Sequence, residues 1–366
     1  MKYQIGLSKN SLPELAVAEA VKNLKSPKLI LFFSGVDKFE EYAKSIHHYF
    51  PEAISMGATT FAAFCRDGAY KETLMMIGFE DGIRCEAGIL EDADKYPLKN
   101  VNRVEKIAQN FKRAENTVCL EFSSALIRCE ELVLSTLNSV LAKKKIAVFG
   151  GSSGDQGNAE KTMIAYNGQT YQNACSFVMI ENLNGKIHFY RENIYKPTKH
   201  CLKSTKVDVK NRVVWEYNQK PAAKAYADAM GVNVNQLPEY LNNYPLGRII
   251  GNEMFIVANN QVVKSNGMEY HARIYNNSQI VILEPDDYRM VINNTLEQVK
   301  KDCVKPSFTL MVNCLARSIL FESDGFLNDF AKIAGRSLGN YVGFSGYGEQ
   351  LREQHFNQTM VLAVFE

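Results

Sequence analysis

A short pattern recurs three times along the chain: an apolar run reaches a glycine, and small hydroxyl residues follow it. The copies read ISMGATT, AVFGGSSGD and YVGFSGYGE. Their glycines are Gly57, Gly150 with Gly151, and Gly343, and the hydroxyl residues are Thr59, Thr60, Ser152, Ser153 and Ser345. Glycine at a strand end permits positive φ or a close approach to a ligand. The recurrence therefore predicts three related polar turns.

Each turn is preceded by the same order of elements. The runs KLILFFS, NTVCLEF and SFTLMVN are continuously apolar, which is typical of strands that are covered on both faces. A helical stripe follows each run, formed by Phe39, Tyr42, Ala43, Ile46 and Phe50, by Leu134, Leu137, Val140 and Leu141, and by Phe326, Leu327, Phe330, Ala331 and Ile333. Strand, helix, strand units build parallel or mixed sheets. We therefore predict an α/β fold of two related halves, with mixed sheets, flanking helices and sheets layered on one another.

The length of 366 residues fits two domains. The polar stretch 192–210, which carries Pro197, favours a boundary near residue 215, giving domains 1–215 and 216–366. A capping box from Ser11 to Glu14 predicts an N-terminal helix that ends near Leu24. We further predict strands in 70–80 and 82–91, a hairpin around Asn167 and Gly168, a helix over 221–231, an antiparallel meander over 246–284 and a closing strand over 358–365.

The composition limits which binding partners and which cellular compartment are expected for the protein. The net charge is only +2 and no block of five basic residues occurs, so nucleic acid and anionic membranes are not expected as partners. The eight cysteines stand singly, with no CxxC pair and no apparent metal site. The N-terminus lacks the pattern of a signal peptide, and no apolar stretch reaches the length of a membrane span. We expect a cytoplasmic protein without membrane insertion.

A pair of oppositely charged residues suggests which ligand the chain could bind. Arg317 and Glu349, with Asn357 and Thr359, would place a cation, a carboxylate, an amide and a hydroxyl near strand ends, where ligands bind in open α/β sheets. An amino acid needs a donor fork for its carboxylate and an acceptor for its ammonium group, and this pair has that chemistry. The alternative is a structural ion pair at a turn.

Two patterns suggest hydrolase chemistry instead. GGSSG fits G-x-S-x-G, which exposes a nucleophilic serine, here Ser152, between a strand and a helix. The polar loop that follows leads into a strand, which favours a backbone nest. Cys314, His355 and Asn357 have the residue types of a cysteine nucleophile, a base and an orienting group. Asp155 either binds ligand or closes its own turn.

Several distant motifs, in order, resemble those of the FIST family, with its N and C domains together covering nearly the whole chain. They are SMGATT from Ser55, FGGSSGD from Phe149, PAAKAYADAMG from Pro221, NCLAR from Asn313, and GFSGYGEQ through HFNQT from Gly343 to Thr359. Two departures from the family pattern occur. The chain reads Cys314, Leu315, Ala316 and Arg317 where the family has Cys-x-Gly-Arg, so that Ala316 replaces the glycine, and it has Phe344 and Ser345 where the family has an aromatic pair.

The resemblance implies a sensory domain protein of signal transduction that is not an enzyme. It would bind an amino acid or a similar metabolite and signal to a histidine kinase or a chemoreceptor. One similar branch binds haem, senses nitric oxide and regulates the histidine kinase of a two-component system. With no CxxCH motif any haem here would be non-covalent, and six histidines compete as its ligand. The expected ligand-binding residues are Gly57, Thr59, Thr60, Gly150, Gly151, Ser152, Asp155, Cys314, Arg317, Ser345, Tyr347, Glu349, His355, Asn357 and Thr359.

Overall fold

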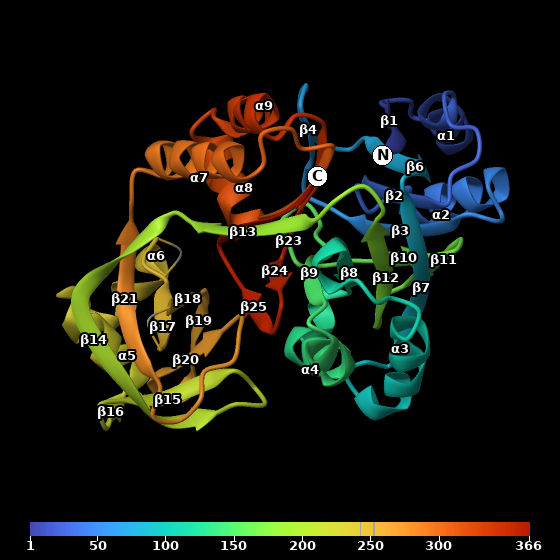
Figure 1. Ribbon diagram of the computed structural model, residues 1–366. Helices are drawn as coiled ribbons and strands as arrows, with labels where there is room; N and C mark the ends of the chain where they lie inside the picture. The colour runs from blue at the N-terminus through green and yellow to red at the C-terminus, as the bar shows by residue number, and fades with distance from the viewer. Residues whose placement is uncertain (242, 252) are drawn as a thin grey trace. The chain divides into compact units, whose positions relative to one another are not determined.

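A computed structural model describes residues 1–241, 243–251 and 253–366 of the chain (Figure 1). The fold is α/β, with mixed sheets and flanking helices, as predicted. The chain divides into two compact units. The first unit comprises Met1–Arg191, Thr295–His355 and Met360–Glu366, and the second comprises Glu192–Asn294 with Phe356–Thr359. The predicted domain boundary at residue 215 stays a prediction. Among the described residues, no helix has the length and apolarity to cross a membrane.

The first unit repeats one order of elements three times. Repeat 1 contains β1 (Lys2–Ser8), α1 (Pro13–Val21), β2 (Leu29–Ser34), α2 (Phe39–Tyr49), β3 (Ile54–Thr59), the hairpin β4 (Ala63–Cys65) and β5 (Gly68–Tyr70), and β6 (Leu74–Asp81). Repeat 2 contains β7 (Ile83–Glu91), α3 (Val101–Ala108), β8 (Thr117–Ser123), α4 (Glu130–Leu141), β9 (Ala147–Ser152), the hairpin β10 (Ile164–Tyr166) and β11 (Gln169–Tyr171), and β12 (Ala174–Asn182).

Repeat 3 keeps this order but is interrupted by the second unit, which begins at Glu192, at the end of the first strand of the repeat. Its elements are β13 (Ile187–Asn193), α7 (Tyr288–Asp302), β22 (Phe308–Cys314), α8 (Leu315–Ser323), α9 (Leu327–Leu338), β23 (Tyr341–Gly346), the hairpin β24 (Gly348–Leu351) and β25 (Gln354–Phe356), and β26 (Thr359–Phe365). Two helices, α8 and α9, stand where the sequence predicted a single one.

The three repeats build three six-stranded sheets with equivalent strand orders. These orders are β1-β6-β2-β3-β10-β11, β7-β12-β8-β9-β24-β25 and β13-β26-β22-β23-β4-β5. In each sheet the parallel pair, β2 with β3, β8 with β9, or β22 with β23, flanks a helical crossover, which confirms the predicted strand, helix, strand units.

The hairpins are exchanged between the sheets in a closed ring. The hairpin of repeat 1 joins the sheet of repeat 3, that of repeat 3 joins the sheet of repeat 2, and that of repeat 2 joins the sheet of repeat 1. The chain therefore leaves one sheet for another directly after each glycine-containing strand. This exchange brings the three turns toward a common point.

Apolar side chains fill both faces of these strands. Helices α1 and α2 pack over β2 and β6 through Val17, Phe39 and Ile46, and α3 and α4 pack over the sheet of β8. The other faces meet in three buried phenylalanines. Phe33 and Phe344 stack with ring centroids 4.8 Å apart, and Phe122 contacts both edge to face at 5.5 and 5.4 Å. This double cover explains the continuous apolar runs of the sequence.

The second unit contains an eight-stranded antiparallel sheet. Its elements are β14 (Tyr195–Asp208), β15 (Val213–Tyr217), β16 (Lys220–Pro221), α5 (Ala222–Met230), α6 (Leu237–Tyr240), β17 (Leu246–Ile250), β18 (Glu253–Val257), β19 (Asn259–Val263), β20 (Gly267–Tyr270) and β21 (Gln279–Pro285). The predicted helix is confirmed as α5, which ends at Met230 with Gly231, at a φ of 70°, as its C-cap. The strands over 246–284 are antiparallel as predicted, but the predicted meander is wrong: β17 pairs with β18 and β19 pairs with β20, and these two hairpins lie at opposite ends of the sheet. The polar stretch 192–210 is mostly strand β14, which pairs with β15 and β21.

The N-terminal capping box was predicted wrongly. The N-cap of α1 is Leu12, which makes no side-chain cap, and the helix ends at Val21. Asn10 organises the approach instead, because its Oδ1 accepts a hydrogen bond from the Leu12 amide at 3.0 Å. The predicted hairpin is confirmed, with Asn167 and Gly168 both at positive φ, 46° and 81°, as a tight two-residue turn requires.

Candidate functional site

The three glycine turns meet in the first unit. We call the meeting point of residues 59–62, 152–155 and 345–347 the turn junction. Backbone hydrogen bonds join its parts: the Phe61 amide donates to the Ser345 carbonyl at 3.1 Å, the Ser345 amide donates to the Ala62 carbonyl at 2.9 Å, and the Gly154 amide donates to the Thr59 carbonyl at 2.6 Å. Residues nearly 300 positions apart in the chain are thus direct neighbours.

Side-chain hydroxyl groups also form hydrogen bonds within the turn junction. Thr60 Oγ1 donates to the Ser345 carbonyl at 2.9 Å and accepts from the Ser345 amide at 2.9 Å. Thr59 Oγ1 accepts from the Met163 amide at 3.0 Å. Ser345 Oγ lies 2.8 Å from Ser318 Oγ. The hydroxyls predicted from the sequence are therefore brought together and buried, and the bonds described here hold the turns to one another.

Two glycines are required because neighbouring backbone lies against them. A Cβ on Gly346 would lie 1.8 Å from the Ser152 carbonyl oxygen, and a Cβ on Gly154 would lie 2.6 Å from the Ser345 carbonyl oxygen. Any side chain at either position would force two turns apart.

The glycines that the sequence singled out have a different role. Gly57, Gly150 and Gly343 lie inside strands and are not among the described glycines with positive φ. Each faces a residue of the parallel neighbour strand: Phe32 for Gly57, Glu121 for Gly150 and Met311 for Gly343. A Cβ on Gly57 would lie 2.5 Å from the Phe32 ring. The missing Cβ at Gly57 thus makes room for a protein side chain, which corrects the expected positive φ.

Asp155 closes its own turn and also holds the third turn. Its Oδ1 accepts from the Gly157 amide at 2.8 Å and from the Tyr347 hydroxyl at 2.6 Å, and its Oδ2 accepts from the Glu160 amide at 2.9 Å. The Tyr347 hydroxyl in turn accepts from the Ala159 amide at 2.9 Å. Burial, and then the neighbouring Asp155 carboxylate, raise the pKa of Tyr347. Asp155 is thus a structural organiser of the loop.

Arg317 and Glu349 are both deeply buried. Arg317, in the first turns of α8, is 1% exposed, and its guanidinium lies 5.5 Å from the Phe321 ring centroid. Glu349 of β24 is 0% exposed and faces Gly151 of β9. A buried charge is costly without compensating charges and hydrogen bonds. The burial of both residues distinguishes them from the partners of an ordinary ion pair at the protein surface.

The structure places the residues of the two predicted hydrolase patterns, around Ser152 and around Cys314, as follows. After Ser152 the chain continues as a loop over 153–163 and enters strand β10, so the strand-to-helix elbow of a serine hydrolase is not formed there. His355 Nδ1 lies 2.9 Å from Gln350 Nε2. Asn357 and Thr359 belong to the second unit, where Asn357 Oδ1 accepts from the Ala258 amide at 3.4 Å. Cys314 ends β22, and its carbonyl accepts from Ser318 Oγ at 3.2 Å.

Sequence reasoning missed several buried polar residues around the junction. Ser318 is one of them, and its Oγ accepts from Asn313 Nδ2 at 2.8 Å and lies 2.8 Å from Ser345 Oγ. Glu121 and Gln350 are both 0% exposed. One signal was available for Glu121, because a carboxylate inside the otherwise apolar run TVCLEF is unusual.

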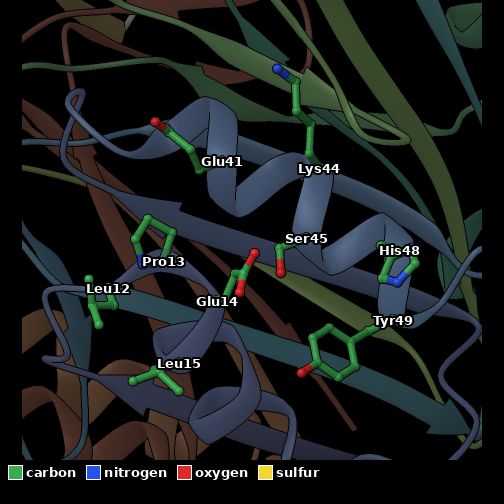
Figure 2. A pocket seen from close by; sticks show the side chains of 9 residues that line it. All are labelled: Leu12, Pro13, Glu14, Leu15, Glu41, Lys44, Ser45, His48 and Tyr49. Carbon is green, nitrogen blue, oxygen red and sulfur yellow. The ribbon is translucent and has the colours of Figure 1, made fainter.

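A separate hollow lies on the surface between α1 and α2. It has a volume of about 1130 Å³ and is lined by Leu12, Pro13, Glu14, Leu15, Glu41, Lys44, Ser45, His48 and Tyr49 (Figure 2). Figure 2 shows the Glu14 carboxyl directed toward Ser45 across the groove. Leu12 and Leu15 are 59% and 50% exposed. None of the predicted ligand-binding residues lines this groove.

Comparison with known proteins gave matches along nearly the whole chain. The FIST N domain matches residues 28–220 and the FIST C domain matches residues 222–352. An uncharacterised protein of Methanocaldococcus jannaschii is 22% identical over 402 aligned residues, which cover 96% of this chain and 76% of that protein. A crystal structure of the hydrogenase maturation protein HypE covers 78% of this chain and 72% of its own at 8% identity, with a TM-score of 0.17. So low a score supports no statement about this chain.

Proposed function

Because the chain belongs to the FIST family, whose domains are sensory domains of signal transduction, we propose that it is a non-enzymatic sensor of an amino acid or a similar small metabolite. The ligand would bind beside the turn junction and change the interaction with a partner, a histidine kinase or a chemoreceptor. A ligand can do this only by favouring one conformation over another.

One observation carries the proposal: Arg317 and Glu349 are both deeply buried in the first unit. A guanidinium recognises a carboxylate through paired N–H donors, and a carboxylate accepts from an ammonium group. Together the two residues offer the complementary charges of a zwitterion. The loop that follows Ser152 supports a role other than hydrolysis.

A thermal-shift screen of the amino acids, followed by calorimetry on the best, tests this proposal. Arg317→Ala should weaken binding more than about tenfold, the loss expected for one charged hydrogen bond. Lys99→Ala is the matched control, because Lys99 pairs with Asp92 at 3.0 Å on the surface of the same unit. Equal affinity in Arg317→Ala and the control would contradict the assignment of Arg317 to the ligand site.

Haem binding is the second candidate, and the groove between α1 and α2 favours it. The groove combines exposed leucines with His48, a potential axial ligand (Figure 2). Protein purified with haem supplied should then show a Soret band that shifts with nitric oxide. His48→Ala should abolish the band, whereas His355→Ala should leave it. A spectrum with no stoichiometric band would exclude this candidate.

A further inference from the structure

The threefold repeat allows equivalent positions to be compared within one chain. Opposite the strand glycine, repeat 1 carries Phe32 and repeat 3 carries Met311, whereas repeat 2 carries Glu121. On the other side of the same glycine lies the exchanged hairpin of another repeat, which supplies Ala165 to the sheet of repeat 1 and Phe64 to the sheet of repeat 3, but Gln350 to the sheet of repeat 2. The sheet of repeat 2 thus carries a carboxyl group and an amide where the other two sheets carry an apolar pair.

Both polar groups lie on one face of the sheet, because residues in register across adjacent strands point the same way. Gly150 separates them and has no side chain. A Cβ on Gly150 would lie 3.0 Å from Glu121 Cγ, so the Glu121 side chain leans over the glycine. The Cγ of Glu121 thus lies on the β9 side of β8, while its carboxyl oxygen Oε2 contacts Ser123 of β8 and Cys175 of β12.

Each of these side chains has one buried acceptor without a hydrogen-bond partner. Glu121 Oε2 accepts from Ser123 Oγ at 2.5 Å and from Cys175 Sγ at 3.3 Å, whereas Glu121 Oε1 has no partner. Gln350 Oε1 has none either. Two buried acceptors cannot satisfy each other, but one proton on the carboxyl group would supply the donor that both lack.

The surroundings favour a proton on Glu121. Cys119 and Cys175 flank it, and burial raises the pKa of both thiols, so neither contributes a charge near neutral pH. Glu130, in the first turn of the overlying α4, is a like charge that disfavours ionisation. Burial is the larger cause, and together they raise the pKa of Glu121 to about 7.

Gln350 connects this carboxyl group to the turn junction. Its Nε2 donates to Ser152 Oγ at 3.2 Å and lies 2.9 Å from His355 Nδ1. Ser152 belongs to the second turn. His355 directly precedes Phe356–Thr359, the segment that belongs to the second unit.

We propose that Glu121 is a buried proton-binding site that regulates the ligand site through Gln350, Ser152 and His355. This inference rests on the proposed sensor function. With the proton bound, Glu121 donates to Gln350 Oε1 and the amide keeps its Nε2 toward Ser152 and His355. Without it, two acceptors face each other and the amide turns over. His355 Nδ1 then meets an amide oxygen, which requires the tautomer or ion protonated at Nδ1.

The test uses the full-length protein without ligand. Infrared difference spectra between about pH 5 and about pH 9 follow the protonated carboxyl band. NMR of histidine-labelled protein follows the His355 ring signals, assigned with His355→Gln. In the wild type we expect both signals to change together with a midpoint near 7. In Glu121→Gln, which keeps a donor for Gln350, the carboxyl band should be missing, and the change of the His355 signals that accompanies it in the wild type should be lost.

Glu121→Met places the residue of repeat 3 at this position and removes donor and acceptor together, and it serves if Glu121→Gln folds poorly. The matched control is Glu105→Gln on the exposed face of α3. The proposal would be overturned if the infrared band of the protonated Glu121 carboxyl group were absent throughout the pH range. It would also be overturned if the His355 signals were identical in the wild type and in Glu121→Gln.

Ligand affinity then separates the two proposals. If the best amino acid of the thermal-shift screen binds with at least about a threefold change across the Glu121 titration, and Glu121→Gln abolishes that change, both stand. If it binds with the same affinity at every pH and in Glu121→Gln, the proposed sensor function is supported and its regulation by Glu121 is contradicted. If no amino acid binds but the His355 signals still change with the protonation of Glu121, the proposed sensor function is contradicted. The proton-binding site and its coupling to His355 are then supported.

Discussion

A carboxyl group in a fully buried apolar layer lowers stability, and this chain supplies its own reference for the cost. Phe32 and Met311 occupy the positions equivalent to Glu121 and bury only carbon and sulfur there. Residues that lower stability without structural need are typical of functional positions. The comparison therefore separates Glu121 from Asp155, whose oxygens hold the loop together.

The pH dependence of stability should reveal Glu121. Its pKa is raised from 4.5 to about 7 on folding, so the unfolded chain releases this proton first as the pH rises. The free energy of unfolding should fall between these two values and stay level above them. The loss is roughly 3 kcal/mol, since one pKa unit is about 1.4 kcal/mol. Urea unfolding of the wild type and of Glu121→Gln across this range measures it, and parallel curves would contradict it.

Tyr347 should contribute more than an ordinary tyrosine. Tyr347→Phe removes a donor to the buried Asp155 and an acceptor for the Ala159 amide, and we expect a loss of about 1 to 3 kcal/mol in urea unfolding. Tyr171→Phe is the control, because the Tyr171 hydroxyl donates to Gln169 Oε1 at the surface. Equal losses in the two variants would show that Asp155 gains nothing from Tyr347.

At the scale of elements, the exchanged hairpins explain why the turns need glycine. Each hairpin must leave its own sheet and enter another sheet beside a second turn, through a connection over 60–62 in repeat 1, over the loop 153–163 in repeat 2 and through Tyr347 alone in repeat 3. Backbone then passes directly against backbone at Gly154 and Gly346. The sequence pattern of glycine with small hydroxyls is the local signature of this crossing.

Gly346→Ala tests the crossing. Its Cβ would lie 1.8 Å from the Ser152 carbonyl oxygen, and we expect a loss of about 3 kcal/mol or more in denaturant unfolding. Gly325→Ala is the control, because Gly325 has a φ of 65° but nothing within 4 Å of the added Cβ. The control should lose about 1 to 2 kcal/mol from backbone strain alone. A smaller loss in Gly346→Ala than in the control would mean that the turns can separate freely.

The elements that the sequence predicted well are those whose pattern is local. Strands β2, β8 and β22 are continuous apolar runs, and the β10 hairpin has an Asn-Gly turn. Strand β14 was read as a polar crossing, because six of its fourteen positions are exposed and its pairing with β15 and β21 is non-local. The hairpin exchange joins residues as far apart in the chain as Ala63 and Phe344, and no local signal encodes it.

The site was predicted in part for the same reason. The turns carry their own glycines and hydroxyls, so Thr60, Ser152 and Ser345 could be found from the sequence. Glu121 and Gln350 acquire meaning only from the residues beside them in the sheet, across β9. The role of Asp155 as a loop organiser depends on Tyr347, which lies 192 positions away.

At the scale of the whole molecule, the ring of exchanged hairpins predicts that the three repeats of the first unit unfold together. Every sheet is completed by another repeat, so none can open alone without exposing a strand edge. The amides of Phe61, Gly154 and Ser345 each donate across two repeats. In native-state hydrogen exchange these amides should show the same opening free energy, and Gly346→Ala should lower all three equally. Separate values would indicate independent repeats.

The ring of hairpins also bears on the order in which a nascent chain can become structured. Synthesis releases β2 and β3 early, but the hairpin that completes their sheet arrives only with residues 164–171. The sheet around β8 and β9 waits still longer, for residues 348–356 near the end of the chain. The first of these sheets therefore has an open edge until residue 171 has been made, and the second has one until residue 356 has been made, and such edges attract other chains. A cell that makes this protein must shield those edges until its last hairpin leaves the ribosome.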